Sequence, residues 1–246
     1  MQFGDWVSYN IHMTIEQLKL LVETVQKLSL ARELDTIIGV VRTAARKLTG
    51  ADGATFVLRD NNQCYYVDED SISPLWKGQR FPLEACVSGW SMMNKQSALI
   101  EDIYKDSRIP IEAYRPTFVK SLAMVPIRSM DPIGAIGNYW ATQHQPTPEE
   151  AELLEALANI TSVSIENVNA YKELTSQNKM LREIAFLQAH QVRAPIANVL
   201  GLISLFNFTE YADPVNGEVL ERMKEATEKL DNLVREIVQK TNELSS

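Results

Sequence analysis

His190 lies in an apolar stretch of the chain, with an arginine three residues after it and a proline five residues after it. Residues 186–206 read FLQAHQVRAPIANVLGLISLF, and the three-four spacing of their apolar residues predicts an amphipathic helix. At about pH 7 a neutral imidazole offers an unprotonated nitrogen that can attack a phosphoryl group. The guanidinium of Arg193 can hold phosphoryl oxygens. The chemistry of these residue types therefore suits phosphoryl transfer at His190.

The predicted helix places His190 away from its apolar face. If Ala189, Val192 and Ile196 form that face, His190 lies roughly 130° from its centre at about 100° per residue. His190 is then expected to point to solvent, and a surface histidine without a function is the alternative interpretation. Pro195 removes the backbone hydrogen bond to the carbonyl four residues before it, so a kink is expected one turn after His190.

The composition excludes several classes of function. Thirty-two acidic and 24 basic residues give the 246-residue chain a net charge of −8, which does not suit nucleic acid or an anionic membrane. No apolar run approaches the ~18 residues that span a bilayer, and the N-terminus lacks the pattern of a signal peptide. Cys64 and Cys86 have no CxxC or metal-ligand spacing, which suits a reducing cytoplasm. With three histidines in the chain, no metal or haem site is predicted, and we expect a cytoplasmic protein.

Periodic patterns in residues 15–146 predict an α+β domain, with an antiparallel sheet flanked by helices. Apolar residues recur at helical spacing over 15–28 and 34–48, and a shorter helix is predicted over 87–96. The predicted strands are residues 54–60, 63–69, 97–102, 121–129 and 133–141. Residues 1–14 match no periodic pattern and are treated as an N-terminal extension.

The order of these elements and four short motifs resemble the GAF domain, a module that senses small molecules and proteins. The motifs are Gly89 in the middle helix, Asp102 with KDSRIP after the next strand, SLAMVPI at 121–127 and IGAIGNYWA at 133–141. The resemblance covers residues 15–170. It implies a six-stranded antiparallel sheet with helices on one face and a pocket on the other.

Aromatic side chains of this domain are candidates for lining a pocket that binds an unidentified small molecule. Packing in an α+β core is the alternative for them. Cys86 comes just before the middle helix, whose N-terminus can stabilise a thiolate. The candidate ligand-contacting residues are Tyr65, Tyr66, Cys86, Trp90, Phe118, Tyr139 and Trp140.

A long helix is predicted to begin at Thr147. Thr147 and Glu150 have the spacing of a capping box, and Pro148 occupies the first helical position. No stop signal follows for about 60 residues, or roughly 90 Å of helix, which requires a partner helix. The apolar spacing predicts a coiled coil with irregular steps near Leu174 and Ala189. Such steps are expected to permit two alternative registers, and a misplaced seam is the alternative interpretation.

Pro214 and Gly217 interrupt the helical pattern, which resumes from Leu220 to Thr241 and so predicts an all-α helical hairpin. Two helices cannot enclose a core, whereas two hairpins make a four-helix bundle, so a parallel homodimer is predicted. The predicted domains are the N-terminal extension (1–14), the GAF-like sensor domain (15–146), the signalling helix or coiled coil (147–180) and the hairpin (181–246).

Residues 179–246 resemble the dimerisation and phosphoacceptor hairpin of sensor histidine kinases. The resemblance rests on His190, Arg193 and Pro195, and it implies that His190 accepts a phosphoryl group. In that family an acidic residue commonly follows the histidine and acts as a base, but Gln191 cannot take a proton, so self-phosphorylation is not expected. Ala194 stands where Thr or Asn commonly orients water, so phosphatase activity by that route is not expected either.

These patterns lead to three functional hypotheses. The first is a two-component sensor in which the GAF-like domain controls phosphoryl transfer at His190, with a response-regulator receiver domain and a kinase catalytic domain acting in trans. The chain ends at Ser246 before any asparagine box or glycine-rich lid, so ATP binding is not expected of it, unless it is a fragment of a longer histidine kinase. The second is a phosphorylation-dead, dimeric docking module, favoured by Gln191 and Ala194. The third is a thiol reductase that uses Cys86, which the lack of a nearby resolving cysteine disfavours.

Overall fold

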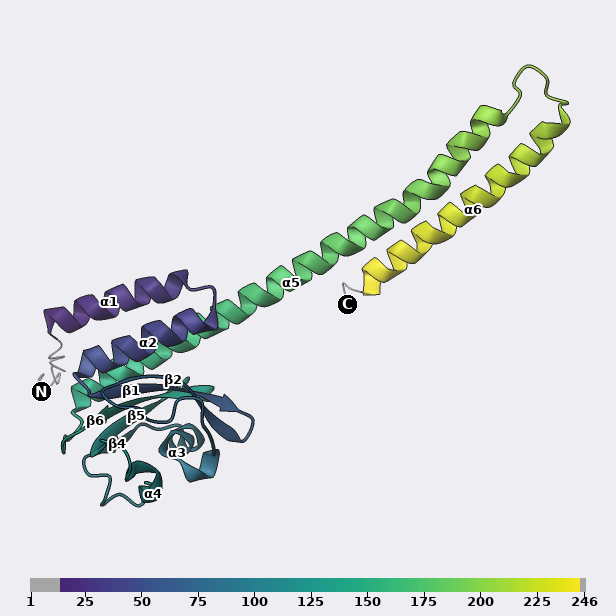
Figure 1. Cartoon of the computed structure of the whole chain (residues 1–246). Coiled ribbons are helices and arrows are strands. Elements are labelled where there is room, and N and C mark those ends of the chain that lie inside the picture. The colour runs from purple at the N-terminus through teal and green to yellow at the C-terminus, as the bar shows by residue number, and fades with distance from the viewer. Residues whose placement is uncertain (1–13, 244–246) are drawn as a thin grey trace, which may run out of the picture. The chain divides into compact units, whose positions relative to one another are not determined.

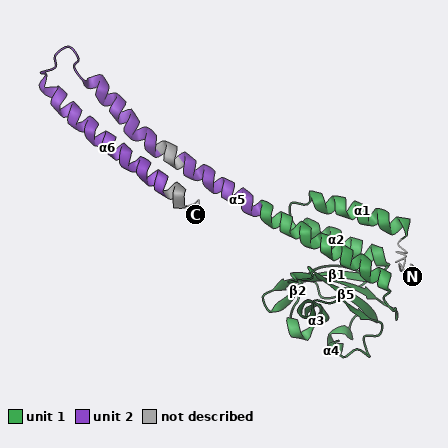
Figure 2. Ribbon diagram, turned by 180° about the vertical axis from the view of Figure 1, so that it is seen from behind, with its two compact units in different colours: residues 1–171 green, residues 172–246 purple. Residues whose placement is uncertain are grey.

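The computed structural model describes the backbone of residues 14–243 and the side chains of residues 14–186 and 191–239. The chain forms two compact units, residues 1–171 and 172–246 (Figure 2). The first unit is an α+β domain and the second is a helical hairpin. One helix, α5 (Pro148–Leu205), contributes residues to both units.

A six-stranded antiparallel sheet forms the centre of the first unit, with its strands in the order β3-β2-β1-β6-β5-β4. The strands are β1 (Gly53–Asp60), β2 (Gln63–Ser71), β3 (Arg80–Pro82), β4 (Ala98–Ile100), β5 (Ser121–Ile127) and β6 (Gly134–Trp140). Each predicted strand is present, and β3 is an additional strand of three residues that pairs with the start of β2. β2 runs on to Ser71 because its pairing with β1 continues as far as Gly53.

Helices precede the sheet and connect its strands. They are α1 (Ile15–Leu30), α2 (Leu34–Thr49), the short 3₁₀ turn η1 (Leu83–Ala85), α3 (Val87–Asn94) and α4 (Ile111–Tyr114). Thr14 and Gln17 form a capping box at the start of α1. Gly50 ends α2 with a left-handed φ of 63°, a conformation that glycine adopts without steric cost.

Side-chain clusters cover both faces of the sheet, because alternate residues of a strand point to opposite sides. One cluster joins α2 and the first part of α5 to sheet residues such as Phe56. The other includes Val57 and Tyr139 from the sheet together with Val87 of α3 and Tyr114 of α4. Figure 1 shows α2 and α5 along one face and α3 and α4 along the other. Helices therefore lie on both faces, whereas the family resemblance implied them on one face.

The start of α5 has the predicted capping box. The Thr147 backbone N–H donates to Glu150 Oε2 at 2.8 Å, and the Glu150 N–H donates to Thr147 Oγ1 at 3.2 Å. Leu154 and Leu157 then bury their side chains in the core of the first unit. The helix continues through Pro195 to Leu205. Among the described residues, no helix is both long enough and apolar enough to cross a membrane.

The second unit consists of the end of α5, a turn, and α6 (Pro214–Glu243). Asn216 is 3% exposed and holds the turn in place. Its Nδ2 donates to the carbonyl oxygens of Asn207 and Glu210, each at 3.1 Å, and its Oδ1 accepts from the Asn207 N–H at 2.8 Å. A buried amide therefore satisfies backbone groups that the end of α5 leaves unpaired.

Candidate functional site

The two helices of the hairpin pack against each other. Each helix contributes one row of side chains to this contact, and the two rows are here called the inner rows. At their centre, Leu202 of α5 and Val219 and Ala226 of α6 are buried. Both rows follow three-four spacing, as in coiled-coil packing. The other members, all buried or half-buried, are Val192, Pro195 and Val199 on α5, Phe206 directly after it, and Asn216, Met223, Leu230, Leu233 and Ile237 on α6.

A second apolar row on each helix, here called the outer rows, is exposed. The outer rows consist of Ile196, Leu200 and Ile203 on α5 and of Leu220, Val234 and Val238 on α6. At about 100° per residue, each outer row lies roughly 80° from the inner row of its helix, in the same rotational sense on both helices. In an antiparallel pair this rotation puts both outer rows on the same side of the hairpin. The sequence analysis placed Val192 and Ile196 on one apolar face, whereas Val192 belongs to the inner row and Ile196 to the outer row.

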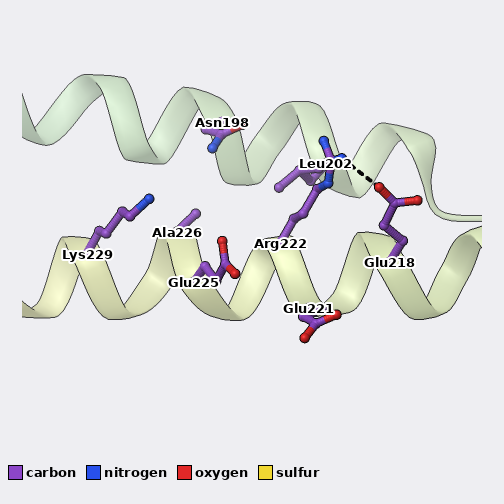
Figure 3. A pocket seen from close by; sticks show the side chains of 8 residues that line it. All are labelled: Asn198, Leu202, Glu218, Glu221, Arg222, Glu225, Ala226 and Lys229. Atoms are coloured by element: carbon purple, nitrogen blue, oxygen red, sulfur yellow. Dashed lines mark hydrogen bonds and ion pairs between the residues drawn. The ribbon is translucent and has the colours of Figure 1, made fainter.

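The opposite side of the hairpin is polar and contains an open cavity of about 600 Å³ (Figure 3). Arg222 and Glu218 form an ion pair at 2.6 Å along its edge. The lining residues are Asn198, Leu202, Glu218, Glu221, Arg222, Glu225, Ala226 and Lys229. Since its charged side chains are all exposed and of both signs, this side of the hairpin has the character of a solvated surface.

The position of His190 lies within α5, but its side chain is outside the described residues, as is that of Ala189. Gln191, Arg193 and Ala194, which follow it, are exposed, and Pro195 is half-buried in the inner row. An exposed guanidinium one turn after His190 is accessible to an incoming phosphoryl group. The orientation of the imidazole and the kink at Pro195 stay predictions.

In the first unit, part of the predicted pocket is a packed aromatic cluster on the α3 side of the sheet. The Trp76 ring meets the rings of Tyr66, Tyr114 and Tyr139 at edge-on angles, with centroids 4.7 to 5.6 Å apart. Tyr139 also shares a 2.9 Å hydrogen bond with Thr55 Oγ1. Burial raises the pKa of all three tyrosines, so their phenols stay protonated.

The remaining aromatic candidates lie apart from this cluster or at its margin. Trp90 and Phe118 are half-buried against it, and the Arg108 guanidinium lies over the Trp90 ring at 4.6 Å. Tyr65 lies under Arg80 at 3.8 Å. Trp140 packs in the cluster on the other face of the sheet. The structure thus brings Tyr66, Cys86 and Tyr139 into one cluster with Trp90 and Phe118 beside it, and it separates Trp140 from them.

Cys86 has a neighbouring cysteine, contrary to the sequence expectation. Cys64 lies beside it in the same side-chain cluster, and Cys86 Sγ lies 3.2 Å from Ser88 Oγ and 3.6 Å from the Pro82 carbonyl oxygen. The Cys64 thiol, and then Ser88 Oγ and the Gly89 N–H, lower the pKa of Cys86. The same contact and burial raise the pKa of Cys64. Sequence analysis missed the pair because the unpredicted strand β3 is what brings position 86 back toward the start of β2.

No group of three or more His, Cys, Asp or Glu side chains in the described part of the chain is placed to hold a metal ion. His144 instead bonds through Nε2 to Glu150 Oε2 at 2.8 Å and stacks on Trp140, so it supports the start of α5.

The GAF domain family model matches residues 31–166, which is more than half of the chain. Solved structures similar to this chain include the GAF domain of a phosphoenolpyruvate-protein phosphotransferase from Acinetobacter, with 16% identity and a TM-score of 0.56 over 65% of this chain and 99% of that chain. Free methionine-R-sulfoxide reductase from Neisseria meningitidis, solved with its substrate, has 16% identity and a TM-score of 0.56 over 63% and 91% of the two chains.

The chromophore-binding domain of a bacteriophytochrome from R. palustris is a third similar structure, with 16% identity and a TM-score of 0.56 over 65% of this chain and 64% of that chain. No curated protein matches the sequence significantly. At this level of identity, the structural similarity establishes the fold.

Proposed function

The chain belongs to the GAF domain family, whose members are sensor domains of signalling proteins, and from this premise we propose that it is a two-component sensor. In this proposal the state of the GAF domain controls phosphoryl transfer at His190. The hairpin gives or receives the phosphoryl group, and a response-regulator receiver domain and a kinase catalytic domain act on it in trans.

The continuity of α5 is the observation that carries this proposal. Leu154, Leu157 and Val168 of α5 are buried in the core of the GAF domain, and Val199 and Leu202 of the same helix pack in the hairpin. Between Val168 and position 190 the helix contains no proline, and such a helix resists bending because each residue is held by backbone hydrogen bonds one turn away. A shift or rotation of α5 that follows a change in the sensor core is therefore carried toward position 190.

The residues around His190 suit a phosphoryl acceptor whose phosphoryl group comes from another protein. A neutral imidazole nitrogen attacks the phosphorus in line, and the exposed Arg193 stabilises the phosphoryl oxygens. Positioning and charge stabilisation supply most of the catalysis in phosphoryl transfer, so both can come from the incoming domain. Gln191 has no proton-accepting carboxylate, which favours a donor in trans over self-phosphorylation.

The outer rows support a homodimer as the working form. Leu200 is 62% exposed and Leu220 is 53% exposed, on the same side of the hairpin, while the other side is polar. A second hairpin that places its own outer rows against them completes a four-helix bundle with a closed apolar core. We propose that the parallel dimer forms in this way.

A phosphorylation-dead docking module is the second candidate, and Gln191 and Ala194 are the observations that favour it. Both lack the chemical groups that assist the kinase and phosphatase steps in the histidine-kinase hairpins that this one resembles. The dimer and the sensor domain would be the same in both candidates. They differ in whether His190 ever carries a phosphoryl group.

The test is a transfer assay on the full chain. The protein is incubated with ATP and an intact histidine kinase, and separately with a phosphorylated receiver domain, and acid-labile label on the chain is measured. We expect label on the wild type, none on His190→Ala, and wild-type labelling of the control Lys179→Ala, which changes an exposed residue of the same helix. If no donor labels the chain, the docking module is the candidate function that remains. If label persists in His190→Ala, the acceptor has been assigned to the wrong residue.

A further inference from the structure

The neighbouring thiols of the GAF domain carry a second inference, which holds whether or not His190 accepts phosphate. We propose that Cys64 and Cys86 are a redox-active dithiol, which a hydroperoxide oxidises to an intramolecular disulfide. Cys86 is the thiol that the oxidant attacks first, and Cys64 is the resolving thiol.

The fold holds the two thiols together through the pairing of β2 with β3. Cys64 lies opposite Phe81 in this ladder, and the next pair joins Gln63 to Pro82. The Leu83 N–H then donates to the Asn62 carbonyl at 3.0 Å, so η1 turns the chain back over the start of β2. Cys86 follows η1 directly. Its Sγ lies 3.6 Å from the Pro82 carbonyl oxygen, on the same side of the sheet as Cys64.

The surroundings of Cys86 are those of a stabilised thiolate. It is the N-cap residue of α3, where backbone N–H groups are unpaired and the helix dipole favours negative charge. Cys86 Sγ lies 3.2 Å from Ser88 Oγ, which shares a 3.0 Å hydrogen bond with the Tyr66 hydroxyl. The Cys64 thiol, and then Ser88 Oγ and the Gly89 N–H, lower the pKa of Cys86 despite its burial.

The exposed fractions of the two cysteines set the order of the reaction. Both cysteines are buried, and Cys86, at 7% exposed, lies nearer to solvent than Cys64, at 0%. Cys64 is also the thiol whose pKa is raised, so it remains protonated while Cys86 reacts. The nucleophile and the resolving group are therefore distinguished by their surroundings.

The reaction with hydrogen peroxide has two balanced steps. The Cys86 thiolate attacks one peroxide oxygen, the O–O bond breaks, and the leaving hydroxide takes up a proton as water, which leaves a sulfenic acid. The Cys64 sulfur then attacks the Cys86 sulfur. The S–O bond breaks, and the departing hydroxide takes the Cys64 proton as a second water. The dithiol loses two electrons and the peroxide gains them.

The experiment treats the reduced full chain with hydrogen peroxide and follows both thiols by alkylation, peptide mapping and dimedone trapping of sulfenic acid. In the wild type we expect Cys64 and Cys86 to disappear together into one linked peptide pair within a single chain. Cys64→Ser keeps a hydroxyl donor but cannot resolve, so it should accumulate a dimedone adduct on Cys86. Cys64→Ala also lacks the resolving thiol, so it should accumulate the same adduct. In Cys86→Ser, Cys64 should be unreactive.

Three outcomes would overturn the proposal. The first is survival of both thiols in the folded chain under peroxide that oxidises the urea-unfolded chain. The second is equal dimedone labelling of Cys86 in the wild type and in Cys64→Ser, which would mean that Cys64 does not resolve. The third is a linkage that joins cysteines of two chains. Circular dichroism of each variant establishes that it is folded, so a lost reaction is not the result of unfolding.

Discussion

Gly89 occupies a place in the first turn of α3 that has no room for a side chain. A Cβ at this position would lie 1.8 Å from the Leu83 carbonyl oxygen, and the backbone of η1 cannot move away as a flexible side chain would. The Gly89 N–H also lowers the pKa of Cys86, so the close approach shapes the thiol site as well. Steric exclusion therefore explains why glycine occupies position 89, and this explanation can be tested without a ligand.

Gly89→Ala should lower the free energy of unfolding by about 2 kcal/mol or more, the cost of a steric overlap that backbone shifts only partly relieve. The matched control is Gly39→Ala in α2, where a Cβ meets nothing within 4 Å. This control should be neutral or stabilise the chain by about 0.5 to 1 kcal/mol, because alanine favours helix over glycine. Urea unfolding measures the free energy of unfolding of both variants. Equal values for the two would contradict the steric explanation.

Asp106 should make one of the contributions to the pH dependence of the 102–109 loop. The Arg108 guanidinium, 2.5 Å from Asp106 Oδ2, holds the pKa of Asp106 below its usual range. The folded pKa is lower than the unfolded value of about 3.9, so the stabilisation is present above pH ~3.9 and is lost as pH falls through the folded pKa. Carboxyl NMR titration of Arg108→Ala should show the Asp106 pKa rising toward about 3.9. An unchanged pKa in this variant would show that the guanidinium is not its cause.

At the scale of elements, the turn between α5 and α6 depends on the buried Asn216. Asn216→Ala should cost about 2 kcal/mol, because the carbonyls of Asn207 and Glu210 and the Asn207 N–H lose their partner. We expect faster hydrogen exchange in residues 200–220 and unchanged exchange in the GAF domain. Asn198→Ala, which changes an exposed residue of the same unit, should leave exchange as in the wild type. Equal protection in both variants would mean that the amide does not hold the turn.

Much of the element order was predictable, because caps and periodicity act locally. The Thr147 capping box appears in the structure as predicted, and so do the helical hairpin and the principal strands. A strand's period of two also separates Tyr139 from Trp140, since neighbours along a strand face opposite sides. The Cys64 contact was not predictable, because it depends on the three-residue strand β3, which is too short to give a pattern. The inner and outer rows are both apolar, so the sequence could not say which one faces α6.

At the scale of the whole molecule, the outer rows should hold the dimer together. Ile203→Glu should raise the dissociation constant of the dimer about a hundredfold or more, because a symmetric interface buries two copies of the added charge. Leu205→Glu is the matched control, since Leu205 is 64% exposed and lies on the opposite side of α5 from Ile203. Light scattering across a dilution series should show dimers for the wild type and for the control. A monomeric wild type would contradict the four-helix bundle.

The central claim is that α5 connects the sensor domain to His190, and insertions into this helix test it most directly. Residues 179–183 are exposed, so residues inserted after Met180 disturb no buried side chain. A seven-residue insertion keeps the coiled-coil register, and a four-residue insertion changes it. The measurement is the rate at which His190 gains label from a phosphorylated receiver domain in the wild type and both insertion variants. The account predicts a rate within about twofold of wild type for seven residues and a change of about tenfold for four residues. Equal rates in all three chains, or no label on His190 in any of them, would contradict it.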